Sequence, residues 1–283
     1  MKTMTDPRTM QQEADALRRA GRRLAVVPTM GALHEGHLAL IREARLRADV
    51  VIVTIFVNPI QFGEGEDYAR YPRDPAGDAS KVQAAGADLL FVPVAAEMFG
   101  SDFQTHVSVG KIGLPLEGAS RPAHFRGVAT VVAKLFHITR PHVAVFGQKD
   151  AQQVAVIGRM IQDLDFDIEL VVVPTVREAD GLAMSSRNAY LTEVQRSEAR
   201  VLHASLRSAA ERIRSGDRSA PAIVGAMREM ITSRSSGLID YVSIADSATL
   251  HELVSLVSGQ RVLISLAVKF GTTRLIDNIH VTV

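Results

Sequence analysis

Two histidines, His34 and His37, are the first side chains whose types and spacing suggest chemistry. They lie in the segment PTMGALHEGH, which follows an apolar run and opens a helix-like pattern. Three residues apart, both imidazoles lie on one helical face. A helix N-terminus offers N–H groups to an anion, and Gly31 and Gly36 let a phosphate or a base approach the backbone. The segment therefore suits a nucleoside triphosphate.

That segment has two other interpretations. The metalloprotease helix has the pattern His-Glu-x-x-His, and the spacing here is one residue shorter. The remaining alternative is an ordinary pair of surface histidines at a helix start.

Two further clusters follow other apolar runs. FVNPIQFG contains a turn and Gln61, whose amide suits a carboxylate or a hydroxyl. FGQKDAQQ places Lys149 at a helix start, where the dipole disfavours a cation unless an anion such as phosphate is present. Gln153 lies four residues later on the same face. The alternatives are an exposed turn for Gln61 and an ion pair with Asp150 for Lys149.

The segment VREADGLAMSSRN supplies two hydroxyls and a guanidinium, Ser185, Ser186 and Arg187, which suit a phosphate. Asp180-Gly181 before them favours a mobile loop, and the polar stretch 61–73 is a second candidate mobile loop. An ordinary solvated loop is the alternative. All four clusters follow predicted strands, which is where ligands bind in open α/β sheets.

Five short apolar runs position these clusters. They are rich in β-branched residues and almost continuously apolar, as is typical of parallel strands covered on both faces. Helical patterns alternate with them and predict a Rossmann-like, doubly wound α/β domain. The expected strands are 24–29, 50–57, 88–93, 143–147 and 168–174, and the expected helices are 36–48, 75–86, 127–138 and 149–163.

The pattern changes near residue 176. Thr192 and Gln195 resemble a capping box that opens a helix expected to run to Gly216, and a second helix is expected at 219–234. Strand-like runs follow at 239–246, 261–270 and 273–283. We therefore expect a Rossmann-like domain at 1–175 and a smaller α+β lid domain at 176–283.

Composition excludes several function classes. The 32 basic and 31 acidic residues give a net charge of +1, without the basic excess of a nucleic-acid-binding surface. The absence of cysteine excludes disulfides, thiolate metal sites and cysteine nucleophiles. The polar N-terminus is unlike a signal peptide, and the apolar run 50–57 is far shorter than the roughly 20 residues that span a membrane. We expect a cytoplasmic protein.

The clusters together resemble a known family. His34-Glu35-Gly36-His37 resembles the HxGH signature of the nucleotidylyltransferases, and Met184-Ser185-Ser186-Arg187 resembles a variant of their KMSKS loop. PTMGALHEGH, FVNPIQFG, YPRD, FGQKDAQQ and VREADGLAMSSRNAYL, in this order over 26–191, closely resemble the pantoate–β-alanine ligases. The resemblance implies a homodimer that joins (R)-pantoate to β-alanine, using ATP and Mg²⁺, through a pantoyl adenylate.

The resemblance also implies residue roles. His37 would donate a proton and would act with His34 and Lys149 in catalysis. Pantoate and β-alanine would be bound by Gln61, Gln153, Asn58, Arg121 and Tyr71. ATP would be bound by Met30, Gly31, Ala32, Leu33, His34, Glu35, Gly36, His37, Gly147, Gln148, Lys149, Asp150, Val176, Met184, Ser185, Ser186 and Arg187. No residue is assigned to a metal. Gln148 departs from the family pattern, in which Glu is expected, and the lost charge is expected to alter ATP affinity.

Two other functions share some of these features. A simple nucleotidylyltransferase would stop at nucleotide transfer and would not need Gln61 or Gln153. A nucleotide-binding module would release no pyrophosphate and would not need Lys149 at a helix start. A requirement for an amine in AMP release separates the ligase from the first alternative, and pyrophosphate formation separates it from the second.

Overall fold

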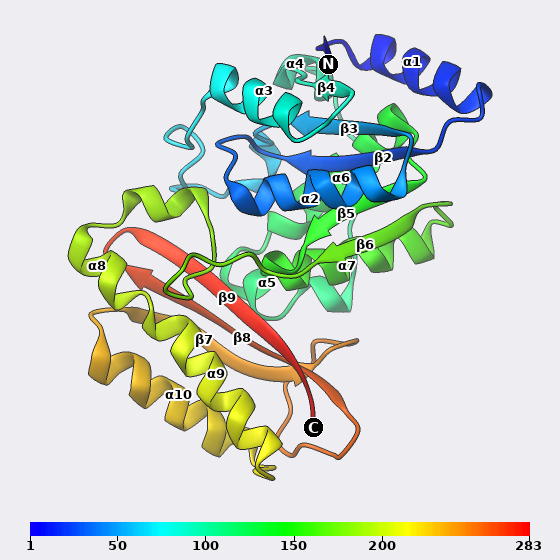
Figure 1. Ribbon diagram of the computed structural model, residues 1–283. Helices are drawn as coiled ribbons and strands as arrows, with labels where there is room; N and C mark the ends of the chain where they lie inside the picture. The colour runs from blue at the N-terminus through cyan, green and yellow to red at the C-terminus, as the bar shows by residue number, and fades with distance from the viewer. The chain divides into compact units, whose positions relative to one another are not determined.

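The computed structural model describes residues Met1 to Val283, which form two compact units. Unit 1 comprises residues 1–148 and 153–174, and unit 2 comprises residues 149–152 and 175–283. Each unit has its own sheet (Figure 1). Unit 1 contains two apolar cores and unit 2 contains one.

A six-stranded sheet with the order β1-β4-β3-β2-β5-β6 forms the centre of unit 1. Its strands are β1 (Lys2–Met4), β2 (Leu24–Thr29), β3 (Val50–Ile55), β4 (Leu89–Phe91), β5 (Val143–Gly147) and β6 (Glu169–Val173). All pairings are parallel, which confirms the predicted doubly wound sheet. The strand order changes direction between β2 and β5, so the usual ligand position lies beyond their carboxyl ends.

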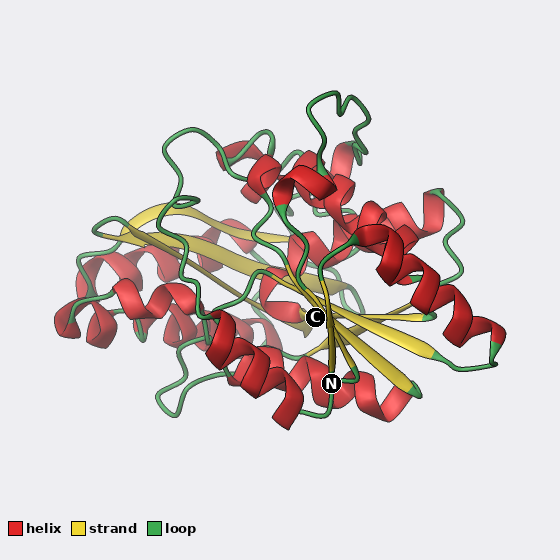
Figure 2. Ribbon diagram, turned by 90° about the horizontal axis from the view of Figure 1, so that it is seen from above, coloured by secondary structure: helices red, strands yellow, loops and turns green.

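Helices cover both faces of this sheet (Figure 2). One core lies against α1 (Pro7–Arg19), α6 (His124–Thr139) and α7 (Ala151–Asp163), and the other lies against α2 (Glu35–Arg47) and α3 (Pro75–Ala84). Neighbouring residues such as Val26 and Val27 belong to opposite cores, which explains why the strands are apolar throughout. The shorter helices and turns are α4 (Ala95–Met98), α5 (Glu117–Ser120), η1 (Pro59–Gln61), η2 (Lys111–Gly113) and η3 (Gln148–Asp150).

Unit 2 is built on an antiparallel sheet with the order β7-β8-β9. The strands are β7 (Leu238–Asp246), β8 (Arg261–Phe270) and β9 (Thr273–Thr282). The helices α9 (Val201–Arg214) and α10 (Ala220–Arg234) share one core with these strands. The turn η4 (Ser186–Tyr190) and the short helix α8 (Glu193–Glu198) precede them. The smaller α+β arrangement expected after residue 176 is confirmed.

The structure differs from the sequence prediction within the helix expected from Thr192 to Gly216. The capping box of Thr192 and Gln195 is confirmed, but α8 ends at Glu198 and α9 begins at Val201. The Leu202 N–H donates to the Ala199 carbonyl oxygen at 3.2 Å, so a tighter turn separates the two helices.

The N-terminal residues also contain elements that the sequence analysis did not predict. Residues Lys2–Met4 form β1, and Asp6 caps α1 through the Thr9 N–H. Only Met10 and Ala14 of α1 are buried, so its apolar stripe is too narrow to stand out in a polar segment.

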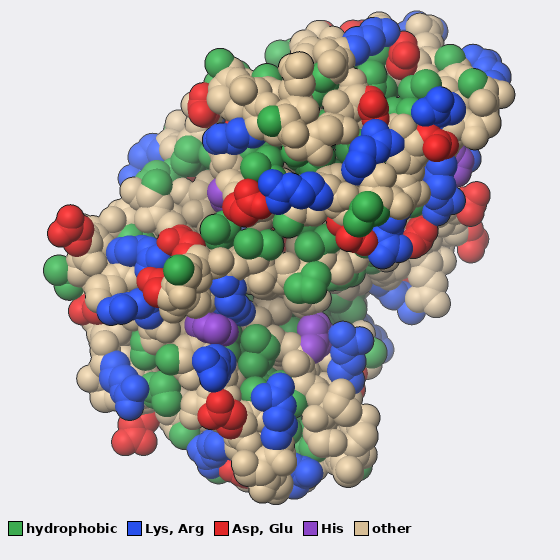
Figure 3. All heavy atoms as spheres, in the orientation of Figure 1, with side chains coloured by type: hydrophobic (Ala, Val, Ile, Leu, Met, Phe, Trp, Pro, Cys, Tyr) green, Lys and Arg blue, Asp and Glu red, His purple; other side chains and the backbone are tan.

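The surface carries no dominant charge on the face seen in Figure 3, where acidic and basic side chains are interspersed. Among the helices, none has both the length and the apolar character that crossing a membrane requires.

Candidate active site

The loop after β2 brings His34 and His37 together at the start of α2. His34 is the N-cap residue, and its Nδ1 accepts the Gly36 N–H at 3.2 Å. His37 Nδ1 accepts the His34 N–H at 3.3 Å, and the ring centroids are 4.1 Å apart. Because each Nδ1 accepts a backbone N–H, the neutral rings carry their protons on Nε2. The pair therefore presents two N–H donors where the helix dipole favours an anion.

A buried carboxylate on α3 holds the loop before these histidines. Asp78 accepts the N–H groups of Ala32 and Leu33 at 2.8 and 2.7 Å, and Lys81 Nζ donates to the Leu33 carbonyl oxygen at 2.9 Å. Ala32 has a φ of 51°, a conformation that is strained for residues other than glycine. Asp78 thus fixes an unfavourable backbone conformation, and these two amides are occupied by its carboxylate rather than directed at a phosphate.

Gln61 ends η1, beyond β3, and only 8% of its surface is exposed. The exposed-turn interpretation is therefore wrong. Asn58 Nδ2 donates to Gln61 Oε1 at 2.9 Å, and Gln61 Nε2 lies 3.0 Å from the Met30 sulfur. Gly127 of α6 packs directly against this turn, because a Cβ there would lie 2.6 Å from the Gln61 Cα. Asn58 Oδ1 is buried without a hydrogen-bond partner, which leaves one acceptor beside Gln61.

Arg121 links Gln61 to the loop that follows it. Its Nε and Nη2 donate to the two carboxylate oxygens of Glu66 at 2.7 and 2.5 Å, and Nη2 also lies 3.3 Å from the Gln61 carbonyl oxygen. Burial would raise the pKa of Glu66, but the hydrogen bonds and charge of Arg121 outweigh burial and lower this pKa. The guanidinium predicted to contact substrate therefore already has a carboxylate partner.

His124 completes this network as a neutral ring. Its Nδ1 donates to the Gln61 carbonyl oxygen at 3.0 Å, and its Nε2 lies 3.2 Å from Arg121 Nη1 and accepts from it. Burial, together with the charge of Arg121, lowers the pKa of His124 to about 4. A second proton would face the guanidinium, so the network requires the neutral ring.

The stretch 61–73, expected to be polar and mobile, contains packed aromatic side chains. The Phe62 ring lies 5.4 Å from that of Tyr68 and 6.0 Å from that of Tyr71. Tyr71 is buried, so its hydrophobic body anchors the loop. A cavity of about 240 Å³ is lined by Tyr68 together with Gly31 and Asp78.

In unit 2, Lys149 lies in the turn η3, and α7 begins at Ala151, two residues later than the expected helix start. Its Nζ is 4.0 Å from Asp150 Oδ1, at the outer limit of an ion pair, so the predicted alternative partner makes only a distant contact. The Lys149 carbonyl oxygen accepts from Asn278 Nδ2 at 2.9 Å, which attaches this turn to β9.

The segment from Val176 to Met184 folds back on itself. Met184 N–H donates to the Val176 carbonyl oxygen at 3.0 Å, and Glu178 N–H donates to that of Leu182 at 2.8 Å. Ser185 then caps η4 by accepting the Arg187 N–H at 3.3 Å. The hydroxyls and guanidinium predicted to bind phosphate therefore follow a closed hairpin.

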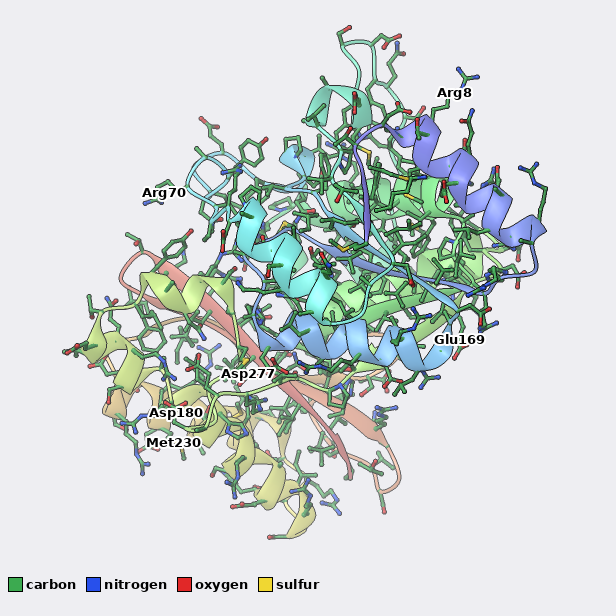
Figure 4. The ribbon with its side chains drawn as sticks, turned by 45° about the horizontal axis from the view of Figure 1, so that its top comes forward. Arg8, Arg70, Glu169, Asp180, Met230 and Asp277 are labelled. Atoms are coloured by element: carbon green, nitrogen blue, oxygen red, sulfur yellow. The ribbon has the colours of Figure 1, made fainter.

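The tip of this hairpin is held by neighbouring side chains. Asp180 accepts from Arg196 at 2.7 Å, and this hydrogen bond lowers the pKa of Asp180 (Figure 4 labels Asp180). Gly181 has a φ of 93°, and a Cβ there would overlap the His203 ring. The segment expected to move is thus anchored at both residues.

The predicted site residues divide between the two units. Unit 1 contains the PTMGALHEGH segment, Asn58, Gln61, Arg121, Gly147 and Gln153, and unit 2 contains Lys149, Val176 and the Met184–Arg187 segment. Sequence reasoning missed Glu66, Asp78 and His124. The only available signal was that His124 lies three residues after the candidate site residue Arg121.

Comparisons with known proteins agree along nearly the whole chain. A sequence model of the family described as pantoate-beta-alanine ligase matches residues 2–280. A pantothenate synthetase from Roseiflexus castenholzii is 57% identical over 255 residues, which are 90% of this chain and 91% of that protein. The crystal structure of pantothenate synthetase from Thermus thermophilus has a TM-score of 0.91 at 45% identity and covers 99% of both chains. Pantoate-beta-alanine ligase from Francisella tularensis, complexed with beta-gamma ATP and β-alanine, has a TM-score of 0.80 at 32% identity and covers 99% of this chain and 97% of that one.

Proposed function

The chain belongs to the pantoate–β-alanine ligase family, and on this premise we infer that it joins pantoate to β-alanine with ATP to form pantothenate. The observation that supports this most directly is the paired histidine cap at the carboxyl end of β2. It places two imidazole rings, with centroids 4.1 Å apart, at a helix N-terminus, an arrangement that suits a polyphosphate.

We propose a two-step reaction. The pantoate carboxylate attacks the α-phosphorus of ATP, a new P–O bond forms, and the bond to pyrophosphate breaks. The β-alanine amine then attacks the acyl carbon of the adenylate and loses a proton as AMP leaves. Charge changes mainly on phosphate oxygens, so positioning and electrostatic stabilisation supply the catalysis.

The residues of unit 1 suit the first step. His34 and His37 would donate hydrogen bonds from Nε2 to phosphate oxygens, and we propose the role of His37 as proton donor in this hydrogen-bonding sense. Asn58 donates to Gln61 Oε1, and Gln61 Nε2 lies beside the Met30 sulfur. We propose that Gln61 Nε2 binds pantoate at this position. Gln153, Arg121 and Tyr71 are proposed as further contacts of the two acids.

The residues of unit 2 supply cationic and hydroxyl groups for phosphate. We propose that Lys149, Ser185, Ser186 and Arg187 bind the ATP phosphates, and that Val176 and Asp150 contact the nucleoside. No cluster of three or more histidine or acidic side chains is arranged to hold a metal. Mg²⁺ is therefore proposed to enter with the ATP phosphates, as it commonly does with waters as its other ligands.

The decisive experiment is ATP–pyrophosphate exchange with purified protein and Mg²⁺, without β-alanine. Exchange that depends on pantoate is expected, and added β-alanine should then give AMP and pantothenate. His37→Ala and Lys149→Ala should each reduce exchange by at least about 100-fold, since each removes a group that contacts charge in the transition state. Folded protein that binds ATP but gives no exchange would contradict the adenylate mechanism.

We also propose that the ligase is a cytoplasmic homodimer, since two-fold dimers are the commonest oligomers. Its residues 1–175 and 176–283 are proposed as the substrate-binding domain and the lid domain. Light scattering of the purified protein tests the dimer, and a monomer at micromolar concentration would contradict it.

A further inference from the structure

Two adjacent residues of β9, Asp277 and Asn278, contact both phosphate-binding segments of unit 2. Asp277 pairs with Arg177, which begins the hairpin leading to Ser185. Asn278 Nδ2 donates to the Lys149 carbonyl oxygen at 2.9 Å. These two segments are far apart in sequence, and β9 is the element that both of them touch. Figure 4 labels Asp277 on this strand.

The Asp277 contact is bidentate and buried. Arg177 Nη1 and Nη2 donate to its two oxygens at 2.6 and 2.9 Å, and only 1% of the Asp277 side chain is exposed. Its Oδ1 also accepts the Asn278 N–H at 2.8 Å. Buried ion pairs are seldom better stabilisers than apolar side chains, so stability alone is a weak reason for this one. The two parallel hydrogen bonds of the guanidinium instead fix the orientation of the Arg177 side chain relative to Asp277.

The oriented Arg177 side chain also contacts the tip of the hairpin. Its Nη1 also donates to the Gly181 carbonyl oxygen at 3.1 Å, and its Nη2 lies 3.4 Å from the Asn278 carbonyl oxygen. One guanidinium therefore joins the strand to the hairpin tip. The hairpin, in turn, leads directly into the Ser185–Arg187 segment.

The β9 strand is a rigid base for these contacts. Asp277 and Asn278 pair with Leu266 and Ser265 of β8 in an antiparallel ladder that extends from Arg261–Thr282 to Phe270–Thr273. Because the two residues are consecutive on this strand, the position of the Lys149 carbonyl relative to Arg177 is set by strand geometry.

We propose that Asp277 and Asn278 are positioning residues that hold Lys149 and the Ser185–Arg187 segment at the separation needed to bind one ATP polyphosphate. This rests on the proposed function, in which both segments bind phosphate. Neither residue touches substrate. Their effect on the reaction is therefore on ATP, with pantoate binding left unchanged.

Asn278→Asp and Asp277→Asn test this with little change in shape. The first places an acceptor against the Lys149 carbonyl, and the second leaves Arg177 without its charge partner. Asn278→Ser, which buries no charge, replaces the first variant if it fails to fold. Ser265→Ala is the matched control, because Ser265 is the cross-strand partner of Asn278 and its buried hydroxyl has no hydrogen-bond partner.

The measurements are ATP–pyrophosphate exchange kinetics and amide hydrogen exchange of the ligand-free protein. Both Asp277 and Asn278 variants should raise the KM for ATP or lower kcat by about 10- to 100-fold, as displaced binding groups do, with the KM for pantoate unchanged. Amides of 147–152 should exchange faster in Asn278→Asp, and those of 178–188 faster in Asp277→Asn. Ser265→Ala should match the wild type in both measurements.

Variants with wild-type kinetics and wild-type amide exchange would overturn the proposal. Equal losses for ATP and pantoate, in step with a lower melting temperature, would also overturn it, because they indicate a general structural role. If the wild type itself shows no pantoate-dependent exchange, the proposed function fails instead. The amide exchange of 147–152 and 178–188 still decides whether these residues position the two segments.

Discussion

At the scale of single residues, His124 has a protonation state that the fold controls. Its pKa of about 4 in the folded chain lies below the usual value of 6.5, because the ring is buried beside Arg121. Between these two pH values the unfolded chain binds the extra proton. His124 therefore adds no pH dependence to the free energy of unfolding above pH 6.5. As the pH drops from 6.5 to 4, it lowers this free energy.

The stability lost between pH 6.5 and 4 through His124 should be about 3 kcal/mol, since one pKa unit corresponds to about 1.4 kcal/mol. His124→Gln, whose amide can still donate to the Gln61 carbonyl, should remove most of that loss. Urea unfolding at pH 7.5, 5.5 and 4.5 measures it. An equally steep decline in the variant would show that another group is responsible.

At the scale of elements, the contact between α6 and η1 positions Gln61, whose side-chain amide we propose binds pantoate. Gly127 lies on α6, and its missing side chain lets the helix backbone approach Gln61. Its carbonyl oxygen also accepts from Asn58 Nδ2 at 3.1 Å. A helix with any larger residue at this position would push η1 outward, and Gln61 with it.

Gly127→Ala should therefore raise the KM for pantoate by at least about 10-fold and destabilise the protein by about 1–3 kcal/mol, as overpacked sites do. Gly225→Ala is the control, because Gly225 lies within α10 and no atom would come within 4 Å of its added Cβ. That change should leave the kinetics unchanged and stabilise the helix by about 0.5–1 kcal/mol. Pantoate kinetics and urea unfolding of both variants provide the measurement, and similar behaviour of the two would rule out the close contact as the cause.

At the scale of the whole molecule, bound ligand should change the accessibility to protease of the loops that contain the candidate site residues. Arg70 lies exposed on the loop 61–73 (Figure 4), and Arg187 lies on the segment after the hairpin. ATP with pantoate should slow tryptic cleavage at both residues. Cleavage at the exposed Arg214, which ends α9 and contributes nothing to the site, should be unchanged. Mass spectrometry of timed digests measures the rates, and ligand-independent cleavage at Arg70 would show that this loop does not respond to substrates.

Much of the fold could be predicted from the sequence because buried parallel strands leave a strong signal. The runs 24–29, 143–147 and 261–270 coincide with β2, β5 and β8 residue for residue. Helix ends were less well predicted, as for α6, which begins at His124 rather than 127. Its first turn has no side-chain cap, and a cap is the signal that sequence patterns provide.

The candidate site residues could be predicted only where several of them belong to one contiguous motif. The four clusters were found because each follows a strand. Asp78 and Glu66 were missed because their partners, Leu33 and Arg121, are remote in sequence, and one sequence does not show which distant residues meet. The same reason hid Asp277 from the sequence analysis.

The short strand β1 has a consequence for the order in which the chain folds. Lys2 and Met4 pair with Leu89 and Phe91 of β4, and β4 in turn pairs with β3. The residues of β1 therefore have no partner until the chain has been synthesised as far as Phe91 and β3 and β4 have paired. Because pairing over such sequence distances is slow, β1 should be the last strand added to its edge of the sheet, although it is the first one made.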